Sequence, residues 1–135
     1  MPEGDFVDRF AGYATVRVHG LGDVLREHRR SRPDCVAVIR HDARVTYAEL
    51  DSRVNRLVGV FRAAGVGPRG RVLWMGQNSL HLLEAILACA KIGAILCSAN
   101  WRQSVAEMRY VLADFDPQVV LWQEFDLGDL ARACR

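Results

Sequence analysis

The residues best placed to bind a ligand are Asn100, Trp101 and Arg102, which follow an apolar run at residues 94–99. A short apolar run between helical segments predicts a buried parallel strand, and ligands of parallel sheets bind beyond the carboxyl ends of the strands. An arginine at such an edge suits a phosphate or a carboxylate partner. Two interpretations remain open: Arg102 holds an anionic ligand, or it only fixes the loop.

No residue of the chain is predicted to act as a general acid, a general base or a nucleophile. Glu49 and Glu107 each lie three residues after a threonine or a serine, which is the spacing of a helix capping box, so we interpret both as helix caps. No histidine has a serine, a cysteine or a carboxylate at a spacing that would orient it, and His81 begins an apolar helical segment. The sequence therefore predicts no catalytic residue.

The four cysteines are widely spaced along the chain. They form no C-x-x-C pair and no histidine lies at ligand spacing from them, so the sequence predicts no metal site. We expect reduced and mostly buried thiols of a cytoplasmic protein at all four positions, which are Cys35, Cys89, Cys97 and Cys134.

Residues 65–70 (GVGPRG) match the G-x-G-x-x-G pattern of dinucleotide-binding turns, but their context differs. A phosphate-binding turn leaves a strand and enters a helix, so that free backbone amides face the anion. These glycines instead leave a predicted helix and enter a predicted strand. We interpret Gly65 as a helix C-cap, with Pro68 following it as a stop.

Positive charge gathers near the end of the first predicted helix. The cluster consists of Arg26, Arg29, Arg30 and Arg32. No aromatic residues interleave with these arginines, so we expect a solvated face that complements the helix C-terminus rather than a nucleic-acid site. Lys91, the only lysine, lies near the end of another predicted helix and is expected close to its last unpaired carbonyls.

Composition excludes several classes of protein. The net charge is only +2, which gives no general electrostatic case for binding nucleic acid or a membrane surface. No apolar run approaches the roughly 18 residues that a membrane-spanning helix needs, and the acidic N-terminal segment does not resemble a signal peptide. We therefore expect a cytoplasmic protein, and a chain of 15.1 kDa predicts a single core.

Periodicity and turn residues divide the chain into alternating strands and helices. Apolar residues recur at helical spacing in four segments, which begin near residues 21, 46, 79 and 104. A further helix begins near residue 127. Strands are predicted at residues 35–40, 44–45, 71–76, 94–99 and 117–122, the first two joined as a hairpin. Five strands with helices between them indicate an α/β fold with a doubly wound, mainly parallel sheet and helices on both faces.

Two blocks of this pattern together resemble one family. The blocks are TYAEL at residues 46–50 and AKIGAILCSANWR at residues 90–102. In their order and spacing they are similar to the N-terminal region of AMP-forming acyl-CoA synthetases and adenylation enzymes. The resemblance covers about residues 20–122 and implies an N-terminal extension at residues 1–20. Residues 21–135 would then form the N-terminal subregion of the AMP-binding domain, incomplete at its C-terminal end.

The resemblance also implies a role for the loop at residues 100–102. In related acyl-CoA ligases the arginine of the N-x-R block helps to hold the nucleotide phosphate of coenzyme A, and Arg102 occupies that position next to Asn100 and Trp101. Where the family usually has proline just after the strand, this chain has Ser98. Serine does not fix the φ angle as proline does, so we expect a softer loop.

The family's phosphate-binding loop and catalytic lysine have no counterpart in these residues. The resemblance therefore implies that the chain is an N-terminal fragment of an ATP-dependent acyl-CoA ligase. The fragment is expected to be inactive alone, and ATP, Mg²⁺ and CoA would be used by the whole enzyme. Its expected partners are the remainder of the enzyme and, through an open sheet edge, further copies of itself. The alternative is a free-standing, non-catalytic α/β module, or a subunit of a split enzyme, that acts through protein association.

Overall fold

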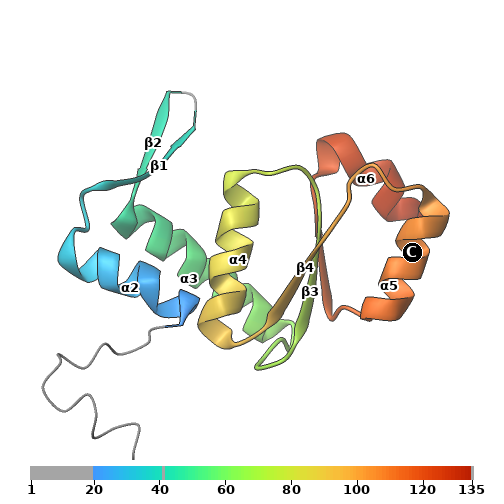
Figure 1. Ribbon diagram of the computed structural model, residues 1–135, viewed down its shortest axis with the longest axis horizontal. Coiled ribbons are helices and arrows are strands. Elements are labelled where there is room, and N and C mark those ends of the chain that lie inside the picture. The colour runs from blue at the N-terminus through green and yellow to red at the C-terminus, as the bar shows by residue number, and fades with distance from the viewer. Residues whose placement is uncertain (1–19, 41, 135) are drawn as a thin grey trace, which may run out of the picture.

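The computed structural model describes residues 20–40 and 42–134 and has an α/β fold (Figure 1). Helices and strands follow one another in the order that the sequence predicts. Their bounds are α2 Leu21–Ser31, β1 Val36–Arg40, β2 Ala43–Thr46, α3 Tyr47–Ala63, β3 Arg71–Met75, α4 Leu80–Ile92, β4 Ile95–Ala99, α5 Val105–Phe115, β5 Val119–Trp122 and α6 Glu124–Ala133. The expected N-terminal extension lies outside the described residues, except for Gly20.

A parallel sheet with the strand order β4-β3-β5 forms the centre of the fold. The central strand β3 pairs with β4, where Arg71 lies opposite Ile95, and with β5, where Val72 lies opposite Val119. A helix connects each strand to the next, and a crossover of this kind is what lets consecutive strands run parallel. The predicted parallel sheet is confirmed.

The strands β1 and β2 do not join this sheet, which corrects the expectation that five strands contribute to one layer. They pair antiparallel in a separate two-stranded sheet, with Val38 opposite Val45. Only two residues separate Arg40 from Ala43, so the chain reverses without a crossover, and a short connection gives antiparallel pairing. The hairpin stands apart from the parallel sheet and adjoins the start of α3 (Figure 1).

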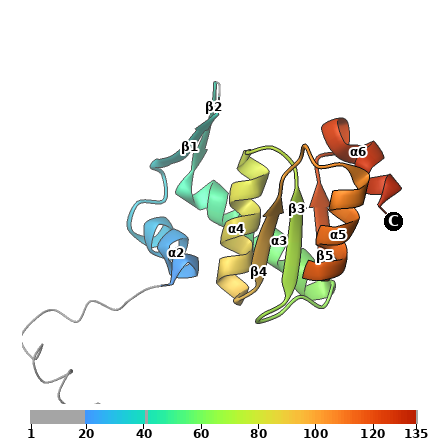
Figure 2. The ribbon, with the colours of Figure 1, turned by 45° about the vertical axis from the view of Figure 1, so that its right-hand side comes forward.

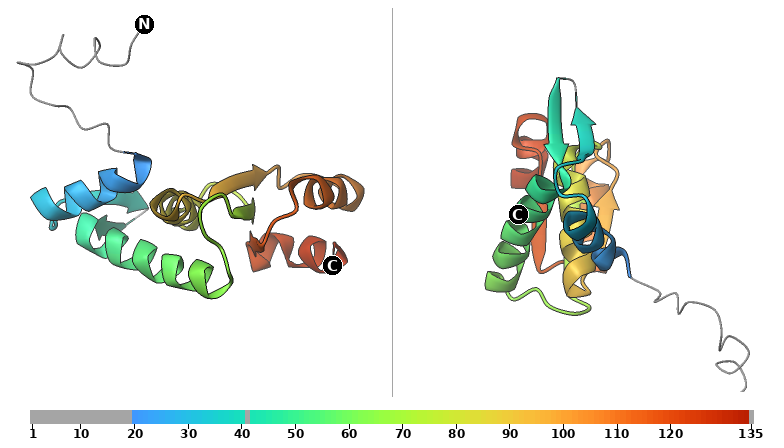
Figure 3. Two further views of the ribbon diagram at one scale, coloured as in Figure 1. Left: turned by 90° about the horizontal axis from the view of Figure 1, so that it is seen from below. Right: turned by 90° about the vertical axis from the view of Figure 1, so that its left-hand side faces the viewer.

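Helices cover both faces of the parallel sheet, as predicted (Figures 2 and 3). Successive residues of a strand point to opposite faces, and β3 accordingly contributes Val72 to one core and Leu73 to the other. The core around Val72 is filled mainly by α3 and α4, whereas α5 and α6 pack over Leu73. Both side chains are completely buried, so β3 depends on the helices of both layers.

A capping box begins α3, as its sequence predicts. The backbone N–H of Glu49 donates to Thr46 Oγ1 at 3.2 Å, and the backbone N–H of Thr46 donates to Glu49 Oε2 at 2.8 Å. These bonds satisfy two of the donors that a helix start leaves unpaired. The helix then buries Leu50, Val54 and Phe61 on one face against α4 and the sheet.

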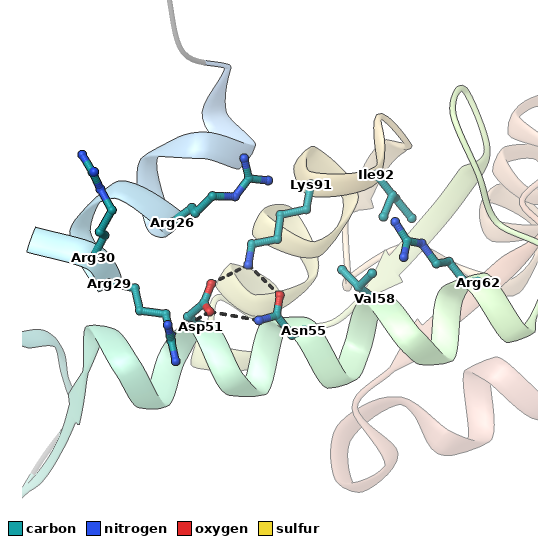
Figure 4. A pocket seen from close by; sticks show the side chains of 9 residues that line it. All are labelled: Arg26, Arg29, Arg30, Asp51, Asn55, Val58, Arg62, Lys91 and Ile92. Atoms are coloured by element: carbon teal, nitrogen blue, oxygen red, sulfur yellow. Dashed lines mark hydrogen bonds and ion pairs between the residues drawn. The ribbon is translucent and has the colours of Figure 1, made fainter. Parts of the chain in front are cut away.

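An almost buried ion pair joins α3 to α4, and it corrects the role expected for Lys91. The Lys91 ammonium donates to Asp51 Oδ1 and to Asn55 Oδ1 rather than to the helix carbonyls (Figure 4). The side chains of Lys91 and Asp51 are only 10% and 8% exposed. Arg29 of α2 approaches the other Asp51 oxygen at 3.2 Å, so one carboxylate links three helices.

The cysteines are free thiols, but their burial differs from the expectation. Cys89 of α4 is buried in the core, and burial raises the pKa of its thiol to about 11. Cys97 and Cys134 are partly buried, whereas Cys35 is exposed at the start of the hairpin. The expectation of mostly buried thiols is therefore wrong for Cys35, which lies exposed in the connection between α2 and β1.

We predict that the Lys91→Met variant loses about 3 kcal/mol of unfolding free energy, because Asp51 would stay buried without its ammonium partner. The double variant Asp51→Leu/Lys91→Met should recover most of the loss, since it leaves neither charge buried. Urea denaturation of both proteins measures the two changes.

The matched control is Arg40→Gln, which neutralises an exposed cation of the hairpin and should change stability by less than about 0.5 kcal/mol. A Lys91→Met protein as stable as this control would show that the ion pair contributes nothing to the packing of α3 on α4.

Candidate functional site

The three parallel strands end together at one edge of the sheet. The register places Met75, the last residue of β3, opposite both Ala99 of β4 and Trp122 of β5. The segments that follow these residues therefore share this edge, where ligands of parallel α/β sheets bind. The predicted position of residues 100–102, at the carboxyl end of a parallel strand, is confirmed.

Residues 100–103 form the loop between β4 and α5, and Asn100 organises its backbone. The Arg102 N–H donates to Asn100 Oδ1 at 3.1 Å, and the Gln103 N–H donates to the Asn100 carbonyl at 3.1 Å. A side-chain oxygen that accepts from the backbone two residues on is typical of a tight asparagine turn. Asn100 therefore sets the direction in which the chain presents Arg102.

The Arg102 side chain is exposed and stacks on its neighbour. Its guanidinium carbon lies 4.6 Å from the centre of the Trp101 ring, a cation–π distance. Among residues 20–40 and 42–134, no carboxylate forms an ion pair with Arg102. The ring restricts the guanidinium while leaving its N–H donors available to an anion.

A second capping box fixes the far end of this loop. The backbone N–H of Ser104 donates to Glu107 Oε2 at 2.8 Å, and the Glu107 N–H donates to Ser104 Oγ at 3.4 Å. The backbone bond, followed by the bond from the Ser104 hydroxyl, holds the pKa of Glu107 below its usual value. The predicted role of Glu107 as a cap is confirmed, and α5 thereby anchors the loop.

The position of Ser98 differs from the expectation. It lies inside β4, opposite Trp74, and not after the strand. Since β4 is an edge strand of the described sheet, proline is also compatible with such a position. The greater softness expected for the loop that carries Arg102 stays a prediction.

Gln123 and Gly76 join the ends of β5 and β3 at the same edge, and sequence analysis missed both. Gln123 Oε1 accepts from the backbone N–H of Gln77 at 2.6 Å, and the Gln123 N–H donates to the Met75 carbonyl at 3.1 Å. A Cβ at Gly76 would lie 2.8 Å from Gln123 Oε1 and 2.9 Å from the Trp74 ring. One glutamine after a strand is not part of any recognisable motif, so sequence analysis could not have identified this contact.

His81 has a carboxylate partner, contrary to the sequence prediction. Its Nδ1 lies 3.1 Å from Glu84 Oε2, one helical turn along α4, and Arg53 of α3 donates to the other oxygen of Glu84. Glu84 is 7% exposed and is thus paired on both sides. The Arg53–Glu84 contact joins α3 to α4. The His–x–x–Glu spacing in the sequence could have predicted the contact between His81 and Glu84, because residues three apart are neighbours on a helix.

The glycines of residues 65–70 have the structural role that their context predicts. Gly65 follows α3 with φ +80°, and the Val66 N–H donates to the Phe61 carbonyl at 2.9 Å, which closes the helix end. The segment then enters β3. This order of elements is not that of a dinucleotide-binding turn.

Two classes of feature are absent from the described part of the chain. Among residues 20–40 and 42–134, no three His, Cys, Asp or Glu side chains gather in a way that could hold a metal ion. Over the same residues, no helix has both the length and the apolar character required to cross a membrane.

Comparisons with known proteins agree with this arrangement. The family model described as "AMP-binding enzyme" matches residues 25–134. Feruloyl-CoA synthase from an Amycolatopsis species is 39% identical over 106 residues, which are 78% of this chain and 22% of that protein. A fatty acid–acyl-carrier-protein ligase from Streptomyces coeruleorubidus is 31% identical over 97 residues, 72% of this chain and 19% of the relative.

Solved structures lead to the same group of proteins. A putative long-chain-fatty-acid CoA ligase from Rhodopseudomonas palustris superimposes with a TM-score of 0.80 at 33% identity, over 86% of this chain and 29% of that chain. The chain spans only about a fifth of the length of the two curated relatives, the feruloyl-CoA synthase and the acyl-carrier-protein ligase.

Proposed function

The chain belongs to the AMP-binding enzyme family, and we propose that it forms the N-terminal part of an ATP-dependent acyl-CoA ligase. Such an enzyme first transfers the AMP group of ATP to a carboxylate, which releases pyrophosphate. The CoA thiol then attacks the acyl carbon, so that a thioester forms and AMP leaves. The names of the relatives support this class of reaction, and the share of their length that the chain matches supports its role as one part of the enzyme.

The loop at residues 100–102 is the part of the chain that would contact coenzyme A. The observation that carries this assignment is the exposed Arg102 guanidinium, which stacks on Trp101 and forms no ion pair with a described residue. A guanidinium offers up to five N–H donors in a fork that matches phosphate oxygens. Asn100 would act by holding the backbone of the loop.

ATP and Mg²⁺ would be bound by a part of the ligase beyond these residues. A Ser/Thr/Gly-rich loop ending in Pro-Lys-Gly, which holds the ATP phosphates in such enzymes, has no counterpart in this sequence. We therefore propose that the 135-residue chain alone does not activate a carboxylate. The acid substrate would be selected elsewhere, and a carrier protein is the competing acceptor, because one relative is named for that acceptor.

The test is a chimaeric ligase in which this chain replaces the matching segment of the Amycolatopsis feruloyl-CoA synthase. We expect the chimaera to form feruloyl-CoA from ferulate, ATP and CoA. In this protein, Arg102→Ala should weaken CoA use by about 10-fold, because a charge-assisted contact contributes about 1.5–3 kcal/mol before solvent screening. Pyrophosphate exchange, which reports the adenylation step, should stay nearly unchanged.

Arg40→Ala is the matched control, since it removes an exposed arginine of the hairpin far from this edge. Equal losses in adenylation and in thioester formation would assign Arg102 to folding of the loop. Wild-type rates of both adenylation and thioester formation in the Arg102→Ala chimaera would show that Arg102 does not contribute to CoA binding.

The same proposal predicts self-association of the isolated chain. Within the described sheet, β4 and β5 pair only with β3, and Ile95 on β4 is 49% exposed. An unpaired strand edge with an apolar side chain is a template for pairing with another copy. Light scattering over a range of concentrations should detect dimers or larger species.

Ile95→Lys places a charge on this edge and should shift the protein towards monomer. Val60→Lys is its control, because Val60 is similarly exposed, at 59%, but lies on α3. A wild-type chain that stays monomeric at high concentration would contradict the prediction, as would equal effects of the two lysines.

A further inference from the structure

A cationic cavity of about 500 Å³ lies between α2, α3 and α4 (Figure 4). Five of the nine residues that line it carry a positive charge, and a single lining residue is acidic. The charged residues are Arg26, Arg29, Arg30, Arg62 and Lys91, with Asp51 as the acid. They come from three helices that are distant in sequence and meet only in the folded chain.

The arginines of α2 only partly form the solvated face that their sequence suggests. Arg26 and Arg30 are exposed and pair with acids one turn away on α2. Arg29 instead crosses to α3 and approaches Asp51 at 3.2 Å. Arg26, Arg29 and Arg30 therefore form one wall of the cavity, whereas Arg32 does not line it, and the positive charges of α3 and α4 complete the lining.

The carboxylate in the lining is already fully engaged. Asp51 accepts hydrogen bonds from Lys91 and from the Asn55 amide at 2.9 Å and forms an ion pair with Arg29, so its charge is already shared between two cations. The carboxyl ends of α3 and α4 add only about half a negative charge each. When Asp23 and Glu27, which pair with Arg26 and Arg30, are also counted, the lining keeps a surplus of about one positive charge.

Several N–H donors of the lining remain available. Among the described residues, Arg62 has neither an ion pair nor a side-chain hydrogen bond. The Lys91 ammonium has three donors, and its two described bonds go to Asp51 and Asn55. In Figure 4 the Arg26 side chain extends towards Lys91, whereas Arg30 points away.

We propose that this cavity binds a small anion with several phosphate groups, held chiefly by Arg26, Arg62 and Lys91. Arginine forks and a lysine ammonium are the side chains that bind phosphate best, and the volume lies within the range of about 300–1,000 Å³ that is typical of small-molecule sites. Arg62 and Lys91 lie in the last turns of helices that lead into β3 and β4. Every residue that lines the cavity lies on one of the three helices, and Arg102 is not among them.

Calorimetric titration of the 135-residue chain tests the proposal, with inorganic phosphate and tripolyphosphate as probes. We expect saturable binding that is tighter for tripolyphosphate and weakens with added salt, because screening reduces the attraction between charges. Arg26→Gln and Arg62→Gln should each weaken binding by about 3- to 5-fold, the size expected for exposed ion pairs. Both residues are exposed, so the variants should keep the fold, which circular dichroism verifies.

Two control variants separate this cavity from other positive charges. Arg40→Gln removes the same charge from the hairpin, and Arg109→Gln removes it from α5, which covers the other face of the sheet. Both should bind tripolyphosphate as the wild-type chain does. The result is independent of the ligase proposal, because it requires neither ATP, CoA nor catalysis.

Three results would overturn the proposal. The first is an absence of saturable binding at millimolar tripolyphosphate. The second is equal weakening in all four variants, which would indicate attraction by overall charge. The third is weakening by a control variant alone, which would place the anion outside this cavity.

Discussion

The structure depends on the burial of β3 on both faces and along both edges. Its residues Val72, Leu73, Trp74 and Met75 are all at most 4% exposed. A parallel strand buried in this way needs a neighbour on each side and a helical layer on each face, since unpaired backbone groups in a core are costly. The order β4-β3-β5 and the two helix pairs supply these contacts, and the register they set brings the strand ends to one edge.

Polar contacts also join α2, α3 and α4, which share one apolar core beside this sheet. Asp51 joins all three helices through Lys91 and Arg29. A Cβ at Gly22 would lie 2.7 Å from the Ala90 carbonyl oxygen, so glycine lets α2 approach α4 closely. The same close approach brings cations of different helices around one cavity. The cationic cavity and the Asn100 loop are thus two separate sites, because no residue of the loop lines the cavity.

Local features of this fold are predictable from the sequence. Thr46 with Glu49, and Ser104 with Glu107, form capping boxes whose partners lie within one helical turn, so spacing alone identifies them. The strand that precedes Arg102 is likewise evident from its apolar run. Long-range features are not predictable in this way. Lys91 and Asp51 are 40 residues apart, and nothing in either segment specifies the other as its partner.

We propose that these residues are one part of a carboxylate-activating ligase. ATP–pyrophosphate exchange tests it most directly, measured on the purified 135-residue chain and on the same chain fused to the remainder of the Amycolatopsis feruloyl-CoA synthase. We expect background exchange for the chain alone and ferulate-dependent exchange for the fusion. Exchange by the isolated chain, or a folded fusion that supports none, would contradict it.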